Sequence, residues 1–409
     1  MQYIGFRRWL LWRVLWLVYV PLAWVVFRQR NRGLPRPPPK GPYLLMGNHV
    51  SAMDPIWAAW ALWHPAHFMA SANLFRVPWL RRLITALGAF PKQKFVKDQG
   101  SVSTLVDLYE AGQIILIYPE GTRTWDGRGI PIRPGTGRLI KQLNARVVFC
   151  RNLTGWMLEP RWALYPRWVP LLLEYTAPMT FPEDMSAEDI TAEVQRQLTI
   201  DPEPAFRGLC LGWRLAWGLP VYLWACPHCF AVEGLVVPPG RGNHVRCHAC
   251  GAQWRVDIRS RLVSETEGVA SWTVRAAYDR IAGHFGDPPL LDADTLEAEG
   301  LVLKASDASV VALDRRSKAR TELARGELRL ERGGLRVLDL NGEETWSMGW
   351  PEIKAFSVEV NDQLQVITAD QLLRVEPGRH STLLWSHFLR HWWWHSRPDL
   401  NALGPVPPP

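Results

Sequence analysis

The chain has 409 residues, which is long for a single hydrophobic core, so two or three domains are expected. Its hydrophobic content of 47% excludes a disordered chain, and 21% charged residues is ordinary for a folded domain. The net charge of +8 permits an anionic partner, either a membrane surface or a nucleic acid. The 23 tryptophans recur in apolar runs beside arginines, which suits a membrane–water interface better than a nucleic-acid groove.

The first predicted element is an apolar run at residues 9–27, interrupted by Arg13 and Pro21. It is about long enough to cross a hydrocarbon core of ~30 Å. A signal peptide is disfavoured because the end of the run lacks small residues for cleavage, and a buried core helix is the other alternative. More positive residues follow the run than precede it, which predicts that the rest of the chain lies on the cytoplasmic face of the inner membrane. We therefore expect residues 1–34 to form a membrane anchor, either spanning or interfacial.

Strands and helices alternate over residues 40–200, after a proline-rich spacer. Short apolar runs predict buried strands, and amphipathic stretches ended by Gly88 and Gly112 predict helices. The alternation predicts an α/β domain. The expected strands are residues 43–46, 114–118 and 147–150, and the expected helices are residues 56–63, 79–87, 101–111 and 139–143.

Residues 205–225 are again apolar and rich in tryptophan, but interrupted by arginine, glycine and proline. This pattern favours an interfacial segment over a membrane span. Two pairs of cysteines follow within residues 226–260, with 17 residues between the pairs. That spacing is typical of a zinc ribbon, in which four thiolates close the coordination of one structural zinc ion. The predicted metal ligands are Cys226, Cys229, Cys247 and Cys250.

After a predicted helix at residues 268–284, the pattern changes to short alternating strands with hairpin turns at 333–334 and 341–342. Seven strands and a final helix are expected within residues 297–396, and a disordered tail at residues 397–409. The expected strands are residues 301–304, 310–313, 327–331, 335–340, 353–360, 364–368 and 372–375. This order of elements resembles the pleckstrin-homology and GRAM type of small β domain.

A histidine and a carboxylate lie close together where the first strand of the α/β domain gives way to a helix. His49 and Asp54 are separated by four residues, so their side chains can meet across the loop. An imidazole held by a carboxylate through one nitrogen can take a proton from a hydroxyl group with the other. The alternative is that Asp54 only caps the helix that begins with Pro55, and the spacing alone does not decide.

A second stretch after a buried strand has the composition of an anion-binding loop. Tyr118–Arg123 combines a guanidinium with a glycine, and Arg133 and Arg138 follow in another glycine-containing turn. Arginine matches a phosphate through its planar fork, and glycine allows the close backbone approach that an anion needs. A solvated surface charge remains the alternative for each arginine taken singly.

Together, the stretches at residues 48–54 and 118–123 resemble the glycerolipid acyltransferase family, best known from lysophosphatidic acid acyltransferases. The similarity covers about residues 40–180. It implies transfer of a fatty acyl group from acyl-ACP or acyl-CoA to a lysophospholipid hydroxyl, most simply that of 1-acylglycerol-3-phosphate, in phospholipid biosynthesis. His49 would be the general base and Asp54 its orienting partner, with no cofactor at the catalytic site. The acceptor would be bound by Glu120, Gly121, Thr122 and Arg123, with Arg123 on its phosphate.

Three departures from the family pattern bear on the acceptor. Lysines, Lys92 and Lys94, stand where the family has an arginine, and Tyr118 replaces the usual phenylalanine. Residues 147–152 replace a valine–proline block. The alternatives are therefore an acyltransferase for another lysolipid or an amino lipid, or a membrane adaptor without catalytic activity. The sequence argues against nucleic acid as a partner, because few basic residues surround the cysteine pairs.

Overall fold

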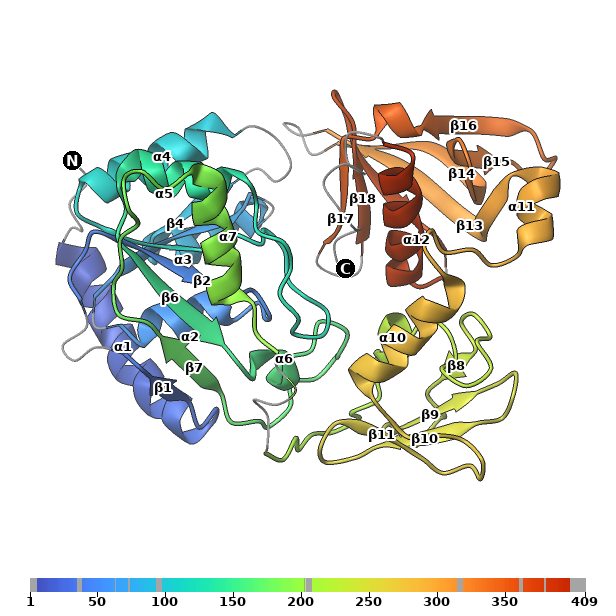
Figure 1. Ribbon diagram of the computed structural model, residues 1–409, viewed down its shortest axis with the longest axis horizontal. Coiled ribbons are helices and arrows are strands. Elements are labelled where there is room, and N and C mark those ends of the chain that lie inside the picture. Colours follow the sequence, from blue (N-terminus) through green and yellow to red (C-terminus); the bar gives the residue numbers. More distant parts are fainter. Residues whose placement is uncertain are drawn as a thin grey trace. The chain divides into compact units, whose positions relative to one another are not determined.

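The computed structural model describes residues 6–34, 39–62, 64–72, 74–92, 98–201, 203, 208–314, 319–359, 363–378 and 380–397. The chain divides into two compact units (Figure 1). The first comprises Met1–Arg161 and Tyr165–Gly212, and the second comprises Trp162–Leu164 and Trp213–Pro409. Each unit is built around its own β structure.

A sheet in the order β1-β7-β6-β2-β5-β3-β4 forms the centre of the first unit. Strands β6, β2, β5, β3 and β4 are parallel neighbours, whereas β7 runs antiparallel to β6. The carboxyl ends of these five strands therefore share one edge, where α/β sheets place their ligands. The strands are β1 (Arg30–Arg32), β2 (Tyr43–Gly47), β3 (Ala66–Ser71), β4 (Ala89–Lys92), β5 (Ile114–Ile117), β6 (Val147–Asn152) and β7 (Leu172–Tyr175).

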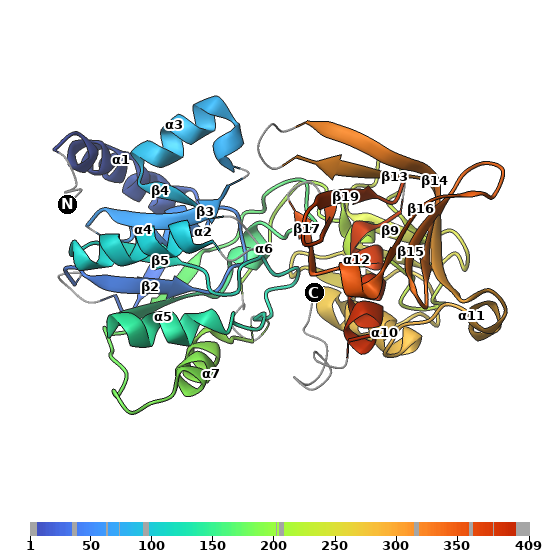
Figure 2. The same ribbon diagram turned by 90° about the horizontal axis from the view of Figure 1, so that it is seen from above.

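Helices cover both faces of this sheet, and Figure 2 shows the strands between α1 and α3 on one side and α5 and α7 on the other. Alternate side chains of β2, β5 and β6, such as Met46, Ile117 and Phe149, join the core cluster that α4, α5 and α7 complete. The α/β architecture expected for this part of the chain is therefore present. The helices are α1 (Phe6–Val25), α2 (Asp54–Trp60), α3 (Pro78–Ala86), α4 (Gln99–Glu110), α5 (Gly135–Leu143), α6 (Gly155–Leu158) and α7 (Ala187–Leu198), with a 3-10 turn at Leu74–Arg76.

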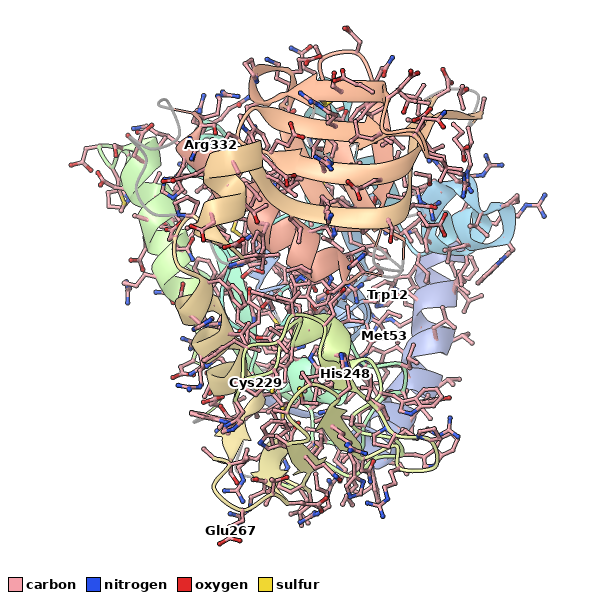
Figure 3. All side chains as sticks on the ribbon, turned by 90° about the vertical axis from the view of Figure 1, so that its right-hand side faces the viewer. Trp12, Met53, Cys229, His248, Glu267 and Arg332 are labelled. Carbon is pink, nitrogen blue, oxygen red and sulfur yellow. The ribbon has the colours of Figure 1, made fainter. Side chains whose placement is uncertain are left out.

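Helix α1 is long and apolar enough to cross a membrane by length and composition. One strip of it packs against the first unit along its length. Trp12, labelled in Figure 3, is buried, the Tyr19 hydroxyl donates to Gln29 Oε1 at 2.7 Å, and Arg8 Nη2 donates to the Ala66 carbonyl at 3.1 Å. The other side exposes large apolar side chains, which are Phe6, Trp9, Leu10, Val14, Leu17, Val18, Leu22, Trp24 and Val25.

The second unit begins with a small antiparallel sheet in the order β12-β11-β10-β9-β8. Trp254 of β10 is fully buried in this small core, and its indole N–H donates to the Ala270 carbonyl at 2.9 Å. The strands are β8 (Leu235–Val236), β9 (His244–Cys247), β10 (Gln253–Val256), β11 (Arg261–Ser264) and β12 (Trp272–Thr273), and a short helix, α9 (Leu219–Tyr222), precedes them.

A larger antiparallel sheet follows in the order β16-β15-β14-β13-β19-β18-β17. Helix α12 (Thr382–His395) packs on β17 and β18 with Leu383, Leu384, Trp385 and Phe388 buried (Figure 1). The strands are β13 (Leu301–Leu313), β14 (Arg320–Glu331), β15 (Gly334–Leu338), β16 (Glu344–Gly349), β17 (Ala355–Glu359), β18 (Gln363–Ile367) and β19 (Leu372–Glu376), and the other helices are α10 (Val274–Phe285) and α11 (Ala293–Glu299).

The structure of this unit differs from the sequence predictions in three places. The strands expected at 301–304 and 310–313 are parts of one strand, β13. The polar residues between them lie at a register shift between Ala305 and Ala308, so the strand continues past them. Strand β16 was not expected. The helix expected at 268–284 begins only at Val274, because the Thr273 hydroxyl caps it by accepting from Ala276 N at 3.1 Å.

The interfacial segment expected at 205–225 is also wrong in its second half. Residues from Leu219 to Ala225 pack inside the second unit, and Trp224 is fully buried between Phe285 and Phe388, with ring centroids 5.0 and 5.7 Å away. An apolar run interrupted by polar residues fits a buried connection as well as a bilayer surface, so periodicity could not distinguish them. Residues 205–207 and the tail at 398–409 lie outside the described residues.

Candidate active site

The loop after β2 brings His49 and Asp54 into direct contact. His49 Nδ1 lies 2.8 Å from Asp54 Oδ2. The Asp54 side chain is 2% exposed and that of His49 is 21% exposed, so the carboxylate lies beneath an imidazole that reaches the surface. A carboxylate on Nδ1 stabilises the tautomer in which Nδ1 holds the proton, and the lone pair is then on Nε2.

Asp54 is held in place by the backbone of its own loop. Its Oδ2 accepts the N–H groups of Val50 at 2.7 Å and Ser51 at 2.9 Å. Helix α2 starts at Asp54 with Pro55 in its first turn, but the carboxylate turns back toward the loop and no side chain caps the helix. The helix-cap interpretation of Asp54 is therefore wrong, because its oxygens are used by the loop and by His49.

Asn152 is a site residue that the sequence did not reveal. It ends β6, is 3% exposed, and its Nδ2 donates to Asp54 Oδ1 at 2.8 Å, while its Oδ1 accepts from Gly155 N at 2.8 Å. Asn48 completes the link, because its Oδ1 accepts the Asn152 N–H at 2.7 Å and its Nδ2 donates to the Asn152 carbonyl at 3.1 Å. A polar residue at the end of a buried strand was the available signal.

Glu120 supports the same loop from the other side. Its carboxyl group is 2% exposed and accepts the N–H of His49 at 3.0 Å and that of Ile130 at 3.4 Å. Burial raises the pKa of Glu120 to about 8, the two backbone N–H groups lower it, and the charge of Asp54 raises it. These contacts make Glu120 a support for the backbone of His49, and binding of an acceptor by Glu120 stays a prediction.

Tyr118 forms the floor under His49. The two rings are stacked with centroids 4.4 Å apart and planes 22° apart. Gly47 makes room for this ring, since a Cβ there would lie 2.8 Å from Tyr118 Cε1. Burial raises the pKa of the Tyr118 phenol, and its hydroxyl is buried without a hydrogen-bond partner among the described residues.

The predicted anion-binding residues are brought together only in part. Gly121 has a φ of +75°, and a Cβ there would lie 3.1 Å from Arg133 Nε, so the Arg133 side chain passes close over the glycine. Thr122 and Arg123 are half-buried in the same loop, and the Arg123 carbonyl accepts from Arg161 Nη1 at 2.8 Å. Arg161, whose guanidinium lies 4.4 Å from the Trp125 ring centroid, was not predicted.

The remaining predicted residues lie elsewhere or are not described. Arg138 is exposed on α5, and Lys92 is half-buried at the end of β4, on the same edge of the sheet as His49. Lys94 lies outside the described residues. Gly137, next to Arg138, allows α5 to pack closely on α7, because a Cβ there would lie 1.9 Å from the Ala187 carbonyl oxygen.

The four predicted zinc ligands meet at one point in the second unit. Cys226 Sγ lies 3.9 Å from Cys250 Sγ, and Cys229 Sγ lies 3.7 Å from Cys247 Sγ. All four sulfurs lie within 4.8 Å of one another, and the four cysteines form no disulfide. Thiolates about 2.3 Å from a tetrahedral zinc ion are about 3.8 Å apart, so the spacing fits the metal. Figure 3 labels Cys229 and His248 at the two turns that supply the sulfurs.

The first unit thus has the architecture of an α/β enzyme, with a histidine–carboxylate pair at the carboxyl edge of its parallel strands. The chain matches the family model described as Acyltransferase over residues 28–151. It is similar to the 1-acyl-sn-glycerol-3-phosphate acyltransferase of Borreliella burgdorferi, with 28% identity over 92 residues, 22% of this chain and 37% of the relative. The enzyme of the same name from Bacillus subtilis is 29% identical over 82 residues, 20% of this chain and 40% of the relative.

The chain spans less than half of the length of these curated relatives. Among solved structures, the 1-acyl-sn-glycerophosphate (LPA) acyltransferase PlsC of Thermotoga maritima is 18% identical, with a TM-score of 0.38. The match covers 48% of this chain and 80% of that one.

Proposed function

We propose that the protein transfers a fatty acyl group from a thioester donor, acyl-ACP or acyl-CoA, to the hydroxyl of a lysophospholipid, most simply 1-acylglycerol-3-phosphate. The observation behind this proposal is the His49–Asp54 pair, 2.8 Å apart at the carboxyl edge of an acyltransferase-family domain. The similarity to two 1-acyl-sn-glycerol-3-phosphate acyltransferases supports the choice of acceptor.

In the proposed reaction, His49 Nε2 takes the proton of the acceptor hydroxyl as its oxygen attacks the thioester carbonyl. The resulting tetrahedral species expels the thiolate of the donor, which takes the proton back from His49. Asp54 stabilises the imidazolium that forms between these two steps, through its hydrogen bond to Nδ1. The products are the diacylated lipid and a free thiol, so neither a metal nor a redox group is needed to balance the reaction.

The acceptor phosphate would be bound by Arg123 and Arg133, with Gly121 and Thr122 offering backbone N–H groups. The passage of Arg133 over Gly121 supports this assignment, because the glycine has no side chain to keep an anion from the guanidinium. Lys92 and Lys94 would add positive charge without the bidentate contact that an arginine makes, and Arg138 would add charge from α5. A larger headgroup, as in another lysolipid or an amino lipid, would use the same edge.

Helix α1 would lie in the membrane interface rather than cross the bilayer. Its contacts through Arg8, Trp12 and Tyr19 pack it along the first unit, and a helix surrounded by lipid cannot keep such contacts. Its opposite side offers a continuous apolar face with Trp24, which is 73% exposed. We place the domain on the cytoplasmic face of the inner membrane, where acyl-ACP and acyl-CoA are available.

In the second unit, the four cysteines would hold a structural zinc ion that closes the turns of the small sheet. The larger sheet and α12 would form a domain of the pleckstrin-homology type. The support for this assignment is the strand order, in which four consecutive strands form a meander and the seventh returns to pair with the first.

The test uses the purified full chain in detergent micelles with acyl-CoA or acyl-ACP and a panel of lysolipids. We expect release of thiol that depends on 1-acylglycerol-3-phosphate, and a fall of about 10²- to 10⁴-fold in His49→Ala. His64→Ala, a histidine of the same unit outside the site, is the matched control. Equal rates in wild type and His49→Ala would contradict the catalytic role. Absence of thiol release with every acceptor would favour the membrane adaptor.

A further inference from the structure

The second unit contains another group of metal-ligating side chains, away from its four cysteines. Asp287, His391 and His395 each offer one ligand atom, and these atoms lie within 4.8 Å of one another. Asp287 Oδ1 is 2.6 Å from His391 Nδ1 and 2.8 Å from His395 Nε2. One carboxylate oxygen therefore lies between two imidazole nitrogens.

Helix α12 and the turn after α10 hold these three side chains close together. His391 and His395 are one helical turn apart near the end of α12, so both rings point to the same side. Asp287 follows the end of α10, in a turn that Trp392 fastens to α12 by donating from its indole N–H to the Pro289 carbonyl at 2.9 Å. The three ligand atoms thus come from a helix and a turn that are already fixed to one another.

The His391 ring packs against a buried residue on one side, and the three ligand side chains are partly exposed to solvent on the other. The buried His387 ring packs against it with centroids 4.4 Å apart, and Tyr278 lies 3.3 Å from His387 Nδ1. The side chains of His391, Asp287 and His395 are 15%, 50% and 38% exposed, so water can reach the point between them. A cation bound there would have room for water ligands.

We propose that Asp287, His391 and His395 bind one divalent transition-metal ion of the zinc class, with water in the remaining position. Two imidazoles and a carboxylate are the donors that such ions prefer, whereas magnesium and calcium prefer oxygen ligands. Ligand atoms about 2.0–2.2 Å from a tetrahedral ion are about 3.4 Å apart. Each histidine therefore has to move by less than 1 Å from its contact with Asp287.

The ion would fasten the end of α12 to the turn after α10. Its affinity is expected to be weaker than that of the four cysteines, because it has only one anionic ligand. The positive charge of Arg390 beside His391 further opposes a cation. We therefore expect binding in the micromolar range and exchange without unfolding, whereas the cysteine site retains its metal.

The experiment adds cobalt(II) alone to the full chain in which the cysteine site already holds zinc. Equilibrium dialysis should find one cobalt ion bound per chain, with visible absorption but without the near-ultraviolet band that cobalt thiolates give. That band identifies any cobalt that has instead exchanged into the cysteine site.

Substitutions at two partly exposed ligands, His395→Ala and Asp287→Asn, should each weaken cobalt binding at least tenfold. The control substitution His64→Ala should leave cobalt binding unchanged. Thermal unfolding without cobalt verifies that each variant is folded, and cobalt should raise the unfolding temperature of wild type but not that of Asp287→Asn. The proposal is overturned if wild type binds no cobalt outside the cysteine site at millimolar concentration. It is also overturned if both variants bind cobalt as wild type does.

Discussion

Replacing Asn152 by alanine tests whether the site depends on the contact between β6 and Asp54. The change removes the donor to Asp54 Oδ1 and the acceptor for Gly155 N, both at 2.8 Å, and leaves both partners buried. The hydrogen bonds between Asn48 and the backbone of Asn152 remain. A buried polar group left without its partner costs about 1–3 kcal/mol, and two such groups should lower the free energy of unfolding by about 2–6 kcal/mol.

The same change should lower kcat, because Asp54 then has one fewer group to fix its direction toward His49. If the lost hydrogen bond to a charged group, about 1.5–3 kcal/mol, is expressed in the transition state, kcat falls about 10- to 100-fold. KM should change little, since Asn152 is buried beneath the site. Urea unfolding and steady-state thiol release, measured on the same preparation, give the two quantities.

Thr154→Ala is the matched control for this prediction. Thr154 is equally buried just beyond β6, and its hydroxyl donates to the Pro170 carbonyl at 2.7 Å and accepts from Leu172 N at 2.8 Å. Its loss should destabilise the fold by a similar amount without changing kcat, because it does not touch Asp54. If Asn152→Ala lowers stability but leaves kcat equal to that of Thr154→Ala, the assignment of Asn152 to the site is refuted.

Three further predictions concern buried groups. The pKa of Glu120, raised from 4.5 to about 8, implies that the stabilising contribution of Glu120 to the free energy of unfolding is fully present below pH 4.5 and is lost as the pH rises through about 8. Glu120→Gln should abolish that slope in urea unfolding at about pH 5 and pH 8.5, and an unchanged slope would assign it to other groups. Tyr118→Phe should raise the free energy of unfolding by about 1 kcal/mol with kcat preserved, because it removes a buried hydroxyl without a described partner. Destabilisation measured by calorimetry would contradict this prediction, because it would show that the hydroxyl makes a stabilising interaction. Cys247→Ser should remove zinc from reduced protein, as metal analysis would detect, and lower the unfolding temperature.

Much of the first unit could be predicted from the sequence because its signals are local. The apolar runs that form β2, β5 and β6 are short and bounded by turn residues, so their length and position follow from composition. His49 and Asp54 are five positions apart within one loop, so their spacing in the sequence was enough to predict that the two side chains could meet. The cysteine pairs are likewise local, and each pair forms one turn of the four-cysteine cluster.

The part that could not be predicted depends on contacts between distant positions. Asn152 is 98 residues from Asp54 in sequence, and only the pairing of β6 with β2 brings them together. The sequence predicts that Glu120 binds the acceptor, but it did not reveal that the fold buries this carboxyl group under the His49 loop. The composition of residues 205–225 predicts an interfacial segment, but residues 219–225 pack inside the second unit. Composition does not reveal which apolar surface a segment will contact.

The position of β2 between β5 and β6 explains how one histidine can be both fixed and exposed. The backbone of His49 is held from β5, through Glu120 and through Thr124 N, which donates to its carbonyl at 2.9 Å. Its ring is held through Asp54, which Asn152 orients from β6. Every one of these supports approaches from the sheet, so none of them occupies the outer side of the ring. Under the proposed mechanism, these contacts would position His49 as the base, and the loop that carries Gly121 and Arg133 would select the acceptor.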